Sequence, residues 1–131
     1  MATNFKNNER NYTVEIVETS RELSKIERVQ LKTNAATKLE EMCPTTLEGI
    51  TGYAIVKIHN EMARDNKDYT RMVIFTDNGE SYYTGSPTFM DTFLSIFSEM
   101  EGETGWGLDC VKLPSRNYQG KDFLSCKLVT L

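Results

Sequence analysis

Cysteine and histidine are scarce in this chain, and those present form no familiar metal-binding or catalytic pattern. Three cysteines (Cys43, Cys110 and Cys126) and one histidine (His59) are widely spaced along 131 residues. An odd, scattered set of cysteines predicts neither a disulfide framework nor a zinc site. A phosphate-binding glycine loop, a nucleophile elbow and a spaced carboxylate pair are also lacking. We therefore expect no metal, no cofactor and no enzymatic activity.

Long apolar stretches are lacking as well. No run approaches the roughly 20 residues that span a bilayer, and residues 1–8 lack the apolar core of a signal peptide. The scattered cysteines suit a reducing compartment. A chain of 131 residues is long enough for one hydrophobic core. We expect a single cytoplasmic domain that does not contact a membrane.

Positive charge is in deficit overall but is unevenly placed. Fifteen basic and nineteen acidic residues give 15 − 19 = −4. Residues 112–127 carry four cations (Lys112, Arg116, Lys121 and Lys127) and one acid, whereas residues 87–104 carry four acids (Asp91, Glu99, Glu101 and Glu103) and no cation. A folded chain of this kind can present a cationic groove while remaining acidic overall.

What the sequence does contain is a strong strand–turn–strand–helix pattern over residues 71–100. Residues 71–76 are β-branched, aromatic and alternating, which predicts a strand. The Asn78-Gly79 pair is typical of a hairpin turn, and residues 81–84 return as a second strand. Ser86 is the expected N-cap of a helix with Pro87 at its first position. The spacing of its apolar residues predicts one buried face, formed by Phe89, Phe93, Ile96, Phe97 and Met100.

The first third of the chain has weaker patterns. Residues 1–10 are expected to form a loose arm, residues 11–17 a strand and residues 18–22 a turn. The apolar residues of 24–32 predict extended structure with a bulge. Asn34 is expected to cap a short helix over residues 35–42, which ends at Cys43-Pro44 because a residue before proline avoids the helical region.

The remainder predicts a β-barrel. Residues 47–63 form a long strand that bends at Gly49 and Gly52, with Ala54, Val56 and Ile58 toward the core. In the returning strand Met72 and Ile74 face inward. Residues 106–113 and 122–130 form the last two strands, the latter with Leu124, Cys126 and Leu128 inward. We therefore predict a mainly β protein with minor α content: an OB-fold five-stranded barrel over residues 47–131, with its helix between strands 3 and 4, and a β/α extension over residues 1–46.

The segment Val73-Ile-Phe-Thr-Asp-Asn-Gly-Glu-Ser-Tyr-Tyr83, followed by an amphipathic helix and two strands, resembles the single-stranded DNA-binding proteins of small tailed bacteriophages, and especially those of φ29-like phages. The resemblance covers about residues 47–131 and places Phe75, Gly79 and Tyr82 at matching positions. It implies an OB-type protein in the host cytoplasm that coats displaced single strands during phage replication, and possible contacts with replication proteins. The chain lacks the acidic, Phe-terminated tail of bacterial single-strand binders.

The expected binding surface is the outward face of the main sheet with two hairpin loops. Aromatic side chains there would stack on bases, and cations would follow the phosphates. The candidate residues are Tyr53, Lys57, His59, Arg64, Lys67, Tyr69, Arg71, Phe75, Tyr82, Trp106, Arg116, Tyr118, Lys121 and Phe123. The alternative for the aromatic residues is packing beneath the N-terminal third or in a dimer interface. Trp106 could equally plug the bottom of the barrel.

Two other functions remain open at this point. A protein-binding OB-like adaptor in phage replication or host takeover would carry a large outward apolar patch without a cationic rim. An enzyme that pairs His59 with a cysteine would need the two side chains within hydrogen-bonding distance. The sequence leaves the oligomeric state open, so a homo-oligomer is possible, and it leaves open whether residues 1–46 cover or extend the groove.

Overall fold

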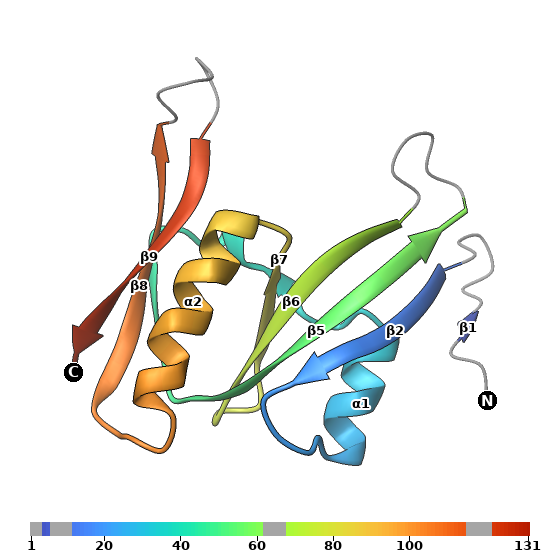
Figure 1. The fold of residues 1–131 in the computed structure, drawn as a ribbon, viewed down its shortest axis with the longest axis horizontal. Helices are drawn as coiled ribbons and strands as arrows, with labels where there is room; N and C mark the ends of the chain where they lie inside the picture. The colour runs from blue at the N-terminus through green and yellow to red at the C-terminus, as the bar shows by residue number, and fades with distance from the viewer. Residues whose placement is uncertain (1–3, 6–11, 62–67, 115–121) are drawn as a thin grey trace.

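The computed structural model describes residues 4–5, 12–61, 68–114 and 122–131, which form two β-sheets and two α-helices. Strands dominate, so the predicted mainly β class is confirmed. Figure 1 shows the two sheets diverging on either side of helix α2. The hairpins β5–β6 and β8–β9 end on the same side of the molecule, at the top of that view.

The larger sheet, here called sheet A, has the strand order β1-β2-β5-β6-β7-β3. All neighbouring pairs are antiparallel except β3 and β7, which are parallel. The bulge expected in residues 24–32 occurs instead in β2, between Ile16 and Glu18. The strands of sheet A are β1 (Asn4–Phe5), β2 (Tyr12–Thr19), β3 (Thr37–Lys38), β5 (Ile50–Asn60), β6 (Asp68–Thr76) and β7 (Ser81–Thr84).

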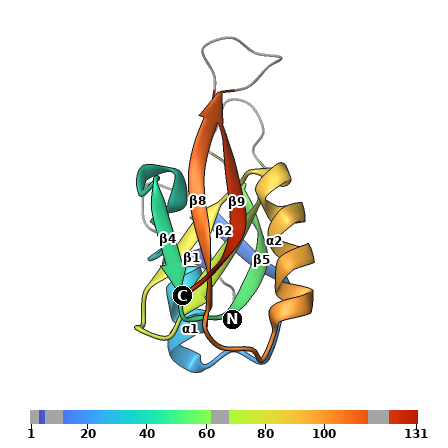
Figure 2. The same ribbon diagram turned by 90° about the vertical axis from the view of Figure 1, so that its left-hand side faces the viewer.

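The smaller sheet, sheet B, has the order β4-β8-β9 and consists of β4 (Thr45–Glu48), β8 (Trp106–Pro114) and β9 (Asp122–Thr130). Figure 2 shows these strands side by side, with α2 beyond β9. The predicted long first strand is divided at Gly49, so β4 joins sheet B and β5 joins sheet A. Gly49 has a φ of +67°, and a Cβ there would collide with the Asp77 carboxylate. The bend predicted at Gly49 is thus confirmed, since it requires the left-handed backbone that glycine tolerates.

The described strands follow the predicted order of strands around one helix, but the two sheets are not closed into a barrel. The neighbour of β7 is β3, a short strand from the N-terminal third, rather than a strand of sheet B. Leu124 and Cys126 are buried as predicted, whereas Leu128 is 42% exposed. No helix in the described ranges has the length and apolar character needed to cross a membrane.

Helix α2 (Pro87–Met100) begins as the sequence predicts and fills the first core. The Ser86 hydroxyl accepts a hydrogen bond from the Phe89 amide, and Pro87 occupies the first turn. Phe89, Phe93 and Phe97 are buried between the two sheets, with successive ring centroids 6.2 and 5.6 Å apart. The predicted Ile96 and Met100 are only partly buried at the edge of this core.

The N-terminal third differs from the prediction, because residues 25–32 form a helix, α1 (Lys25–Lys32), rather than extended chain. Ser24 and Glu27 form a reciprocal capping box at its start. At its end the amides of Asn34 and Ala35 bond back to Leu31 and Gln30, with Asn34 at φ +58°. This arrangement is a Schellman motif, in which asparagine can take the left-handed position.

The short helix predicted over residues 35–42 is also wrong. Residues 37–38 add strand β3 to the edge of sheet A, and the following residues form a single 3₁₀ turn, η1 (Leu39–Glu41). Asn34 does not begin that helix but ends α1. A fully buried Leu39 anchors the turn in the first core, which explains why tertiary packing overrides the local helical tendency.

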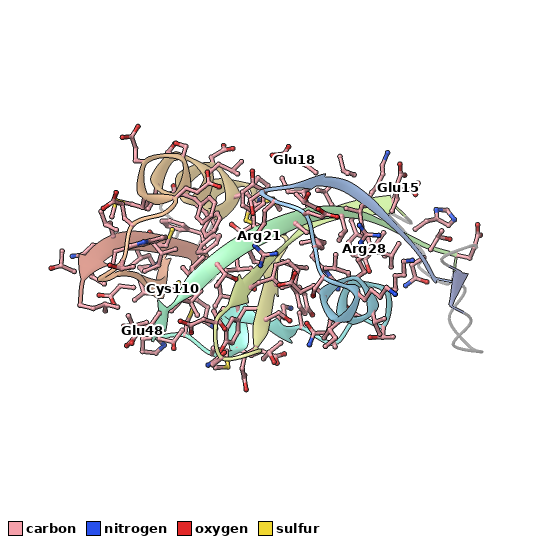
Figure 3. The ribbon with its side chains drawn as sticks, turned by 90° about the horizontal axis from the view of Figure 1, so that it is seen from below. Glu15, Glu18, Arg21, Arg28, Glu48 and Cys110 are labelled. Carbon is pink, nitrogen blue, oxygen red and sulfur yellow. The ribbon has the colours of Figure 1, made fainter. Side chains whose placement is uncertain are left out.

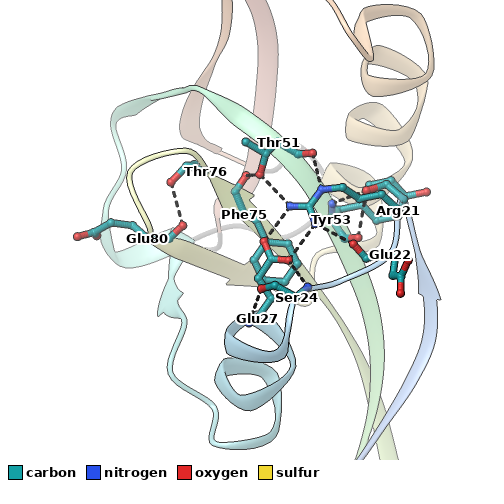
Figure 4. A network of polar contacts seen from close by, with 10 residues as sticks. Arg21, Glu22, Ser24, Glu27, Thr51, Tyr53, Phe75, Thr76 and Glu80 are labelled. Atoms are coloured by element: carbon teal, nitrogen blue, oxygen red, sulfur yellow. Dashed lines mark hydrogen bonds and ion pairs between the residues drawn. The ribbon is translucent and has the colours of Figure 1, made fainter.

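Helix α1 covers the face of sheet A opposite to α2 and so creates a second core. Leu23 and Leu31 pack there with two buried sets of strand residues: Ala54, Val56 and Ile58 from β5, and Val73 and Phe75 from β6. Arg21 fixes the start of α1 to β5. Its guanidinium makes two hydrogen bonds of 2.9 and 2.8 Å to the Glu27 carboxylate and one of 3.0 Å to the Thr51 carbonyl (Figure 4). Within the N-terminal third, α1 therefore covers one face of sheet A, while β1, β2 and β3 extend the sheet at its two edges.

The packing of α1 predicts unequal effects for two apolar residues on the same helix. Leu31 is 6% exposed and Val29 is 58% exposed. Leu31→Ala should lower the free energy of unfolding by about 2–5 kcal/mol, because it leaves a cavity in the second core. Val29→Ala should change it by no more than about 0.5 kcal/mol. Urea unfolding monitored by circular dichroism measures both, and equal effects would contradict this placement of α1.

Candidate nucleic-acid interface

The predicted binding residues of β5 and β6 do not share one face of sheet A. Tyr53 on β5 pairs with Ile74 on β6, whereas Phe75 on β6 pairs with Gly52 on β5. Tyr53 and Phe75 therefore occupy neighbouring positions of the ladder and not directly opposed ones. Directly paired residues point to the same side of a sheet, and sequence neighbours point to opposite sides. Tyr53, Lys57 and His59 therefore belong to the α2 side, and Tyr69, Arg71 and Phe75 belong to the α1 side. The prediction that these residues of β5 and β6 share one face is wrong.

Four of the predicted stacking aromatics are buried. Tyr53 is 9%, Phe75 2%, Tyr82 9% and Trp106 6% exposed. Phe75 lies in the second core, and the other three lie in the first. These rings cannot stack on a nucleic-acid base without unfolding part of a core. Phe75 packs beneath α1 of the N-terminal third, as the alternative expects, whereas the other three pack in the first core with α2.

The polar atoms of Tyr53 and Trp106 also have internal partners. The Tyr53 hydroxyl donates a 2.7 Å hydrogen bond to Glu18, and the indole N–H of Trp106 donates a 2.9 Å bond to the Glu103 carbonyl. Burial, reinforced by Glu18, raises the pKa of Tyr53 to about 12. The Tyr53 ring meets Phe93 and Phe97 edge-on, with centroids 5.8 and 5.6 Å away. Both residues therefore stabilise the junction of α2 with the sheets.

Seven of the other predicted residues are an exposed aromatic, a lysine in a groove and five loop residues. Phe123 is 38% exposed and pairs across the β8–β9 ladder with Leu113, which is 41% exposed. Lys57 is exposed in a groove of about 430 Å³, lined by Thr13, Glu15, Lys57, His59 and Asp68. The predicted loop residues lie outside the described ranges; they are Arg64, Lys67, Arg116, Tyr118 and Lys121.

His59 is held between two carboxylates at the end of the β5–β6 ladder. Its Nε2 lies 2.6 Å from Glu61 and its Nδ1 lies 2.6 Å from Asp68. These hydrogen bonds, Glu61 first and then Asp68, raise the pKa of His59 above its ordinary value. An imidazole flanked by two acids is a poor phosphate ligand, because an incoming anion would meet their negative charge.

The cysteines are poorly suited to act as nucleophiles. Burial raises the pKa values of the Cys43, Cys110 and Cys126 thiols, that of Cys126 to about 11. A thiol with a raised pKa carries little of the reactive thiolate. Within the described residues, both ring nitrogens of His59 bond to carboxylates rather than to a thiol. The geometry therefore offers no support for the His59–cysteine enzyme.

The structure does bring Tyr69 and Arg71 together with Tyr83, at the margin of the second core. The Arg71 guanidinium lies 3.8 Å from the ring centroid of Tyr83 and 5.6 Å from that of Tyr69. All three side chains are half-buried. Arg71 also donates a 2.5 Å hydrogen bond to the side-chain oxygen of Asn34. We call Tyr69, Arg71 and Tyr83 the tyrosine–arginine platform.

The platform depends on how α1 ends. The Schellman motif places Asn34 directly after α1, and its side chain then holds the guanidinium of Arg71 on β6. Sequence reasoning missed Tyr83, Asn34 and the adjacent Lys38, which pairs with Tyr83 in the β3–β7 ladder. The signals for α1 were present in the sequence as Ser24-x-x-Glu27 and Asn34. The contact of Asn34 with Arg71 had no such signal, since the two are 37 positions apart.

Comparison of the chain with models of protein families, with curated proteins and with solved structures gave no match.

The His59 cluster predicts a measurable pKa and a pH-dependent contribution to stability. The sequence has one histidine, so its imidazole proton resonances in an NMR titration are unambiguous. We expect a pKa above 6.5, and lower values in Glu61→Gln and Asp68→Asn. Because the folded pKa is raised, the stabilisation is fully present below the unfolded pKa and is lost as the pH rises through the folded pKa.

The same pH dependence of stability is expected to appear in the variant His59→Asn. Its loss of stability relative to the wild type should be larger near pH 6 than near pH 9, as followed by urea unfolding at both pH values. Lys57→Ala on the same strand face is the matched control, because it leaves His59, Glu61 and Asp68 in place. A pKa at or below 6.5 would contradict the contacts of His59 with Glu61 and Asp68.

Proposed function

We propose that this chain binds single-stranded DNA without sequence preference, and that the tyrosine–arginine platform is its contact with the bases. The observation that carries the proposal is the half-buried Arg71 side chain, whose guanidinium lies 3.8 Å from the ring centroid of Tyr83 and 5.6 Å from that of Tyr69 at the margin of the second core. Aromatic rings and guanidinium planes stack on every base, because every base has a π-face. The platform thus replaces the larger aromatic face that the sequence predicted.

The hydrogen-bonding capacity of Arg71 supports a phosphate contact at the same place. A guanidinium has five N–H donors. Within the described residues, the hydrogen bond to Asn34 engages one nitrogen, Nη1. Lys38 is exposed and pairs with Tyr83 in the β3–β7 ladder, so it lies on the same side of the sheet as the platform. A base stacked on the platform would therefore place its phosphates near two cations.

The fold is compatible with an OB-type core, which we include in the proposal. The continuous segment β4–β5 contributes to both sheets, and two strands, one helix and two further strands follow in the order that the resemblance to phage single-strand binders implies. In this interpretation β3 occupies the edge of β7 and leaves the barrel open. Protection of displaced strands during phage replication in the host cytoplasm would be the corresponding biological role.

The test is binding of a fluorescein-labelled oligo(dT), measured by anisotropy at low and at moderate salt. The label is needed because Trp106 is buried and would report binding poorly. Tyr83→Ala should weaken binding by about 1–3 kcal/mol, which is about 5- to 150-fold at about 1.4 kcal/mol per tenfold. Arg71→Gln should weaken binding and also reduce its salt dependence, since a phosphate contact is lost.

Two controls make the result specific. Lys57→Ala removes a cation from the opposite face of sheet A and should leave the affinity within about twofold. A duplex of equal length should bind weakly, because its bases are already stacked on one another. If the folded protein does not bind oligo(dT) at low salt, or if Lys57→Ala and Tyr83→Ala weaken binding equally, the platform proposal fails.

The second candidate function is a protein-binding adaptor. It is favoured by one observation, the exposure of Ile26 (71%) and Val29 (58%) on neighbouring turns of α1. The same titration separates the two functions. A folded chain that does not bind single-stranded DNA at low salt would favour the adaptor.

A further inference from the structure

The outward surface of α1 combines exposed apolar residues with a row of cations. Ile26 and Val29 are 71% and 58% exposed. Lys25, Arg28 and Lys32 recur at i, i+3 and i+7, so they lie along one flank of the helix, beside the apolar pair. We call these five residues the basic helix surface. This surface therefore offers a partner both apolar and positively charged groups.

The cations of this surface are available for a partner. Among the described residues, the acid of α1 itself, Glu27, is paired with Arg21 on the other flank, and Lys25, Arg28 and Lys32 have no ion pair. Arg28 and Lys32 border a groove of about 270 Å³ whose floor includes Leu23 and Ile16 and whose rim includes Glu22. This side of α1 is therefore positively charged and partly apolar.

A complementary surface exists on the same chain, where α2 ends. Glu99, Glu101 and Glu103 are exposed, and residues 87–104 contain no cation. Two apolar residues belong to the same end of the fold: Met100 follows Glu99 and is half-buried, and Leu131, whose amide bonds to the Gly105 carbonyl, is 60% exposed. We call these five residues the acidic end surface.

The acidic end surface is held in a fixed shape. The Glu103 amide donates to the Met100 carbonyl at 2.9 Å, the Leu131 amide donates to the Gly105 carbonyl at 2.9 Å, and the Trp106 indole bonds to the Glu103 carbonyl. An ordered segment loses less conformational entropy on binding than a loose one. The acids are therefore presented as a preformed site.

The two surfaces lie on opposite sides of sheet A. Figure 3, which views the molecule from below, shows α2 on one side of the sheet and α1 on the other, with Glu18 and Arg28 labelled on the corresponding sides of β2. One chain cannot bring its own two surfaces together. Different patches that meet between copies form a heterologous contact, which repeats in a row or a ring instead of closing a two-fold dimer.

We propose that the basic helix surface of one copy binds the acidic end surface of another copy of this chain, so that the protein self-associates head to tail. Three cations face three acids, and Ile26 and Val29 face Met100 and Leu131. This interface is separate from the tyrosine–arginine platform. It therefore goes beyond the proposed binding of single-stranded DNA and can be correct or wrong independently of it.

The experiment is sedimentation velocity of the full chain over a range of protein concentrations, at low and at high salt. The wild type should show a mass that grows with concentration and falls as salt screens the charges. Two charge-reversal variants, R28E/K32E and E101K/E103K, should each remain monomeric, because like charges then meet at the interface. Circular dichroism checks that both are folded, and Lys57→Glu controls for a change of charge elsewhere.

Mixing the two variants gives the decisive result. In an equimolar mixture, the intact acidic end of R28E/K32E can bind the intact basic helix of E101K/E103K, and the two reversed surfaces are also complementary. Association should therefore return in the mixture, although neither variant associates alone. Tyr83→Ala should associate like the wild type, whatever its effect on oligo(dT) binding.

Three outcomes would overturn the proposal. The first is a wild type that stays monomeric at high concentration and low salt. The second is a mixture of folded variants that stays monomeric while the wild type associates, which would show that these surfaces do not meet. The third is an R28E/K32E variant that loses oligo(dT) binding but keeps the wild-type mass, which would make the helix a nucleic-acid contact.

Discussion

Burial of both faces of the β5–β6 ladder is the constraint on which the rest of this structure depends. On β5, Tyr53 enters the core shared with α2, and its neighbour Ala54 enters the core beneath α1. Ile74 and Phe75 repeat this arrangement on β6. A strand covered on both sides has no free face for a ligand. Binding surfaces must therefore lie where the covering elements end.

The tyrosine–arginine platform illustrates this rule. Helix α1 ends at its Schellman motif, and Asn34 directly after it bonds to Arg71 at the margin of the second core. The side chains there are Tyr69, Arg71 and Tyr83, and the Arg71 guanidinium lies over the ring of Tyr83 and near that of Tyr69. Such a stacked guanidinium is ordered before any ligand arrives, which lowers the entropy cost of binding. In the proposed function, this margin of the core supplies the stacking surface.

The errors in predicting the site have one physical origin. Alternation shows which residues share a face, but it does not show which face is wet when both sets are apolar or aromatic. Tyr53 and Ile55 alternate with Ala54 and Val56, so either set could be the core, and both are. The predicted phase between β5 and β6 is also one residue out of step, because it places Ala54 and Ile74 on the same face. Only the ladder, in which Tyr53 is opposite Ile74, fixes that phase.

The sequence by itself determined the local elements: the cap at Ser86, the buried phenylalanines of α2, the turn at Gly79, the bend at Gly49 and the order of strands around one helix. These follow from contacts within a few residues or from the conformational freedom of glycine. The tertiary structure alone decided that α1 covers the sheet, that Trp106 and Phe75 are buried, and that Asn34 meets Arg71. These outcomes depend on which distant segments compete for the same apolar surface, and that competition is settled by the free energy of the whole packed chain.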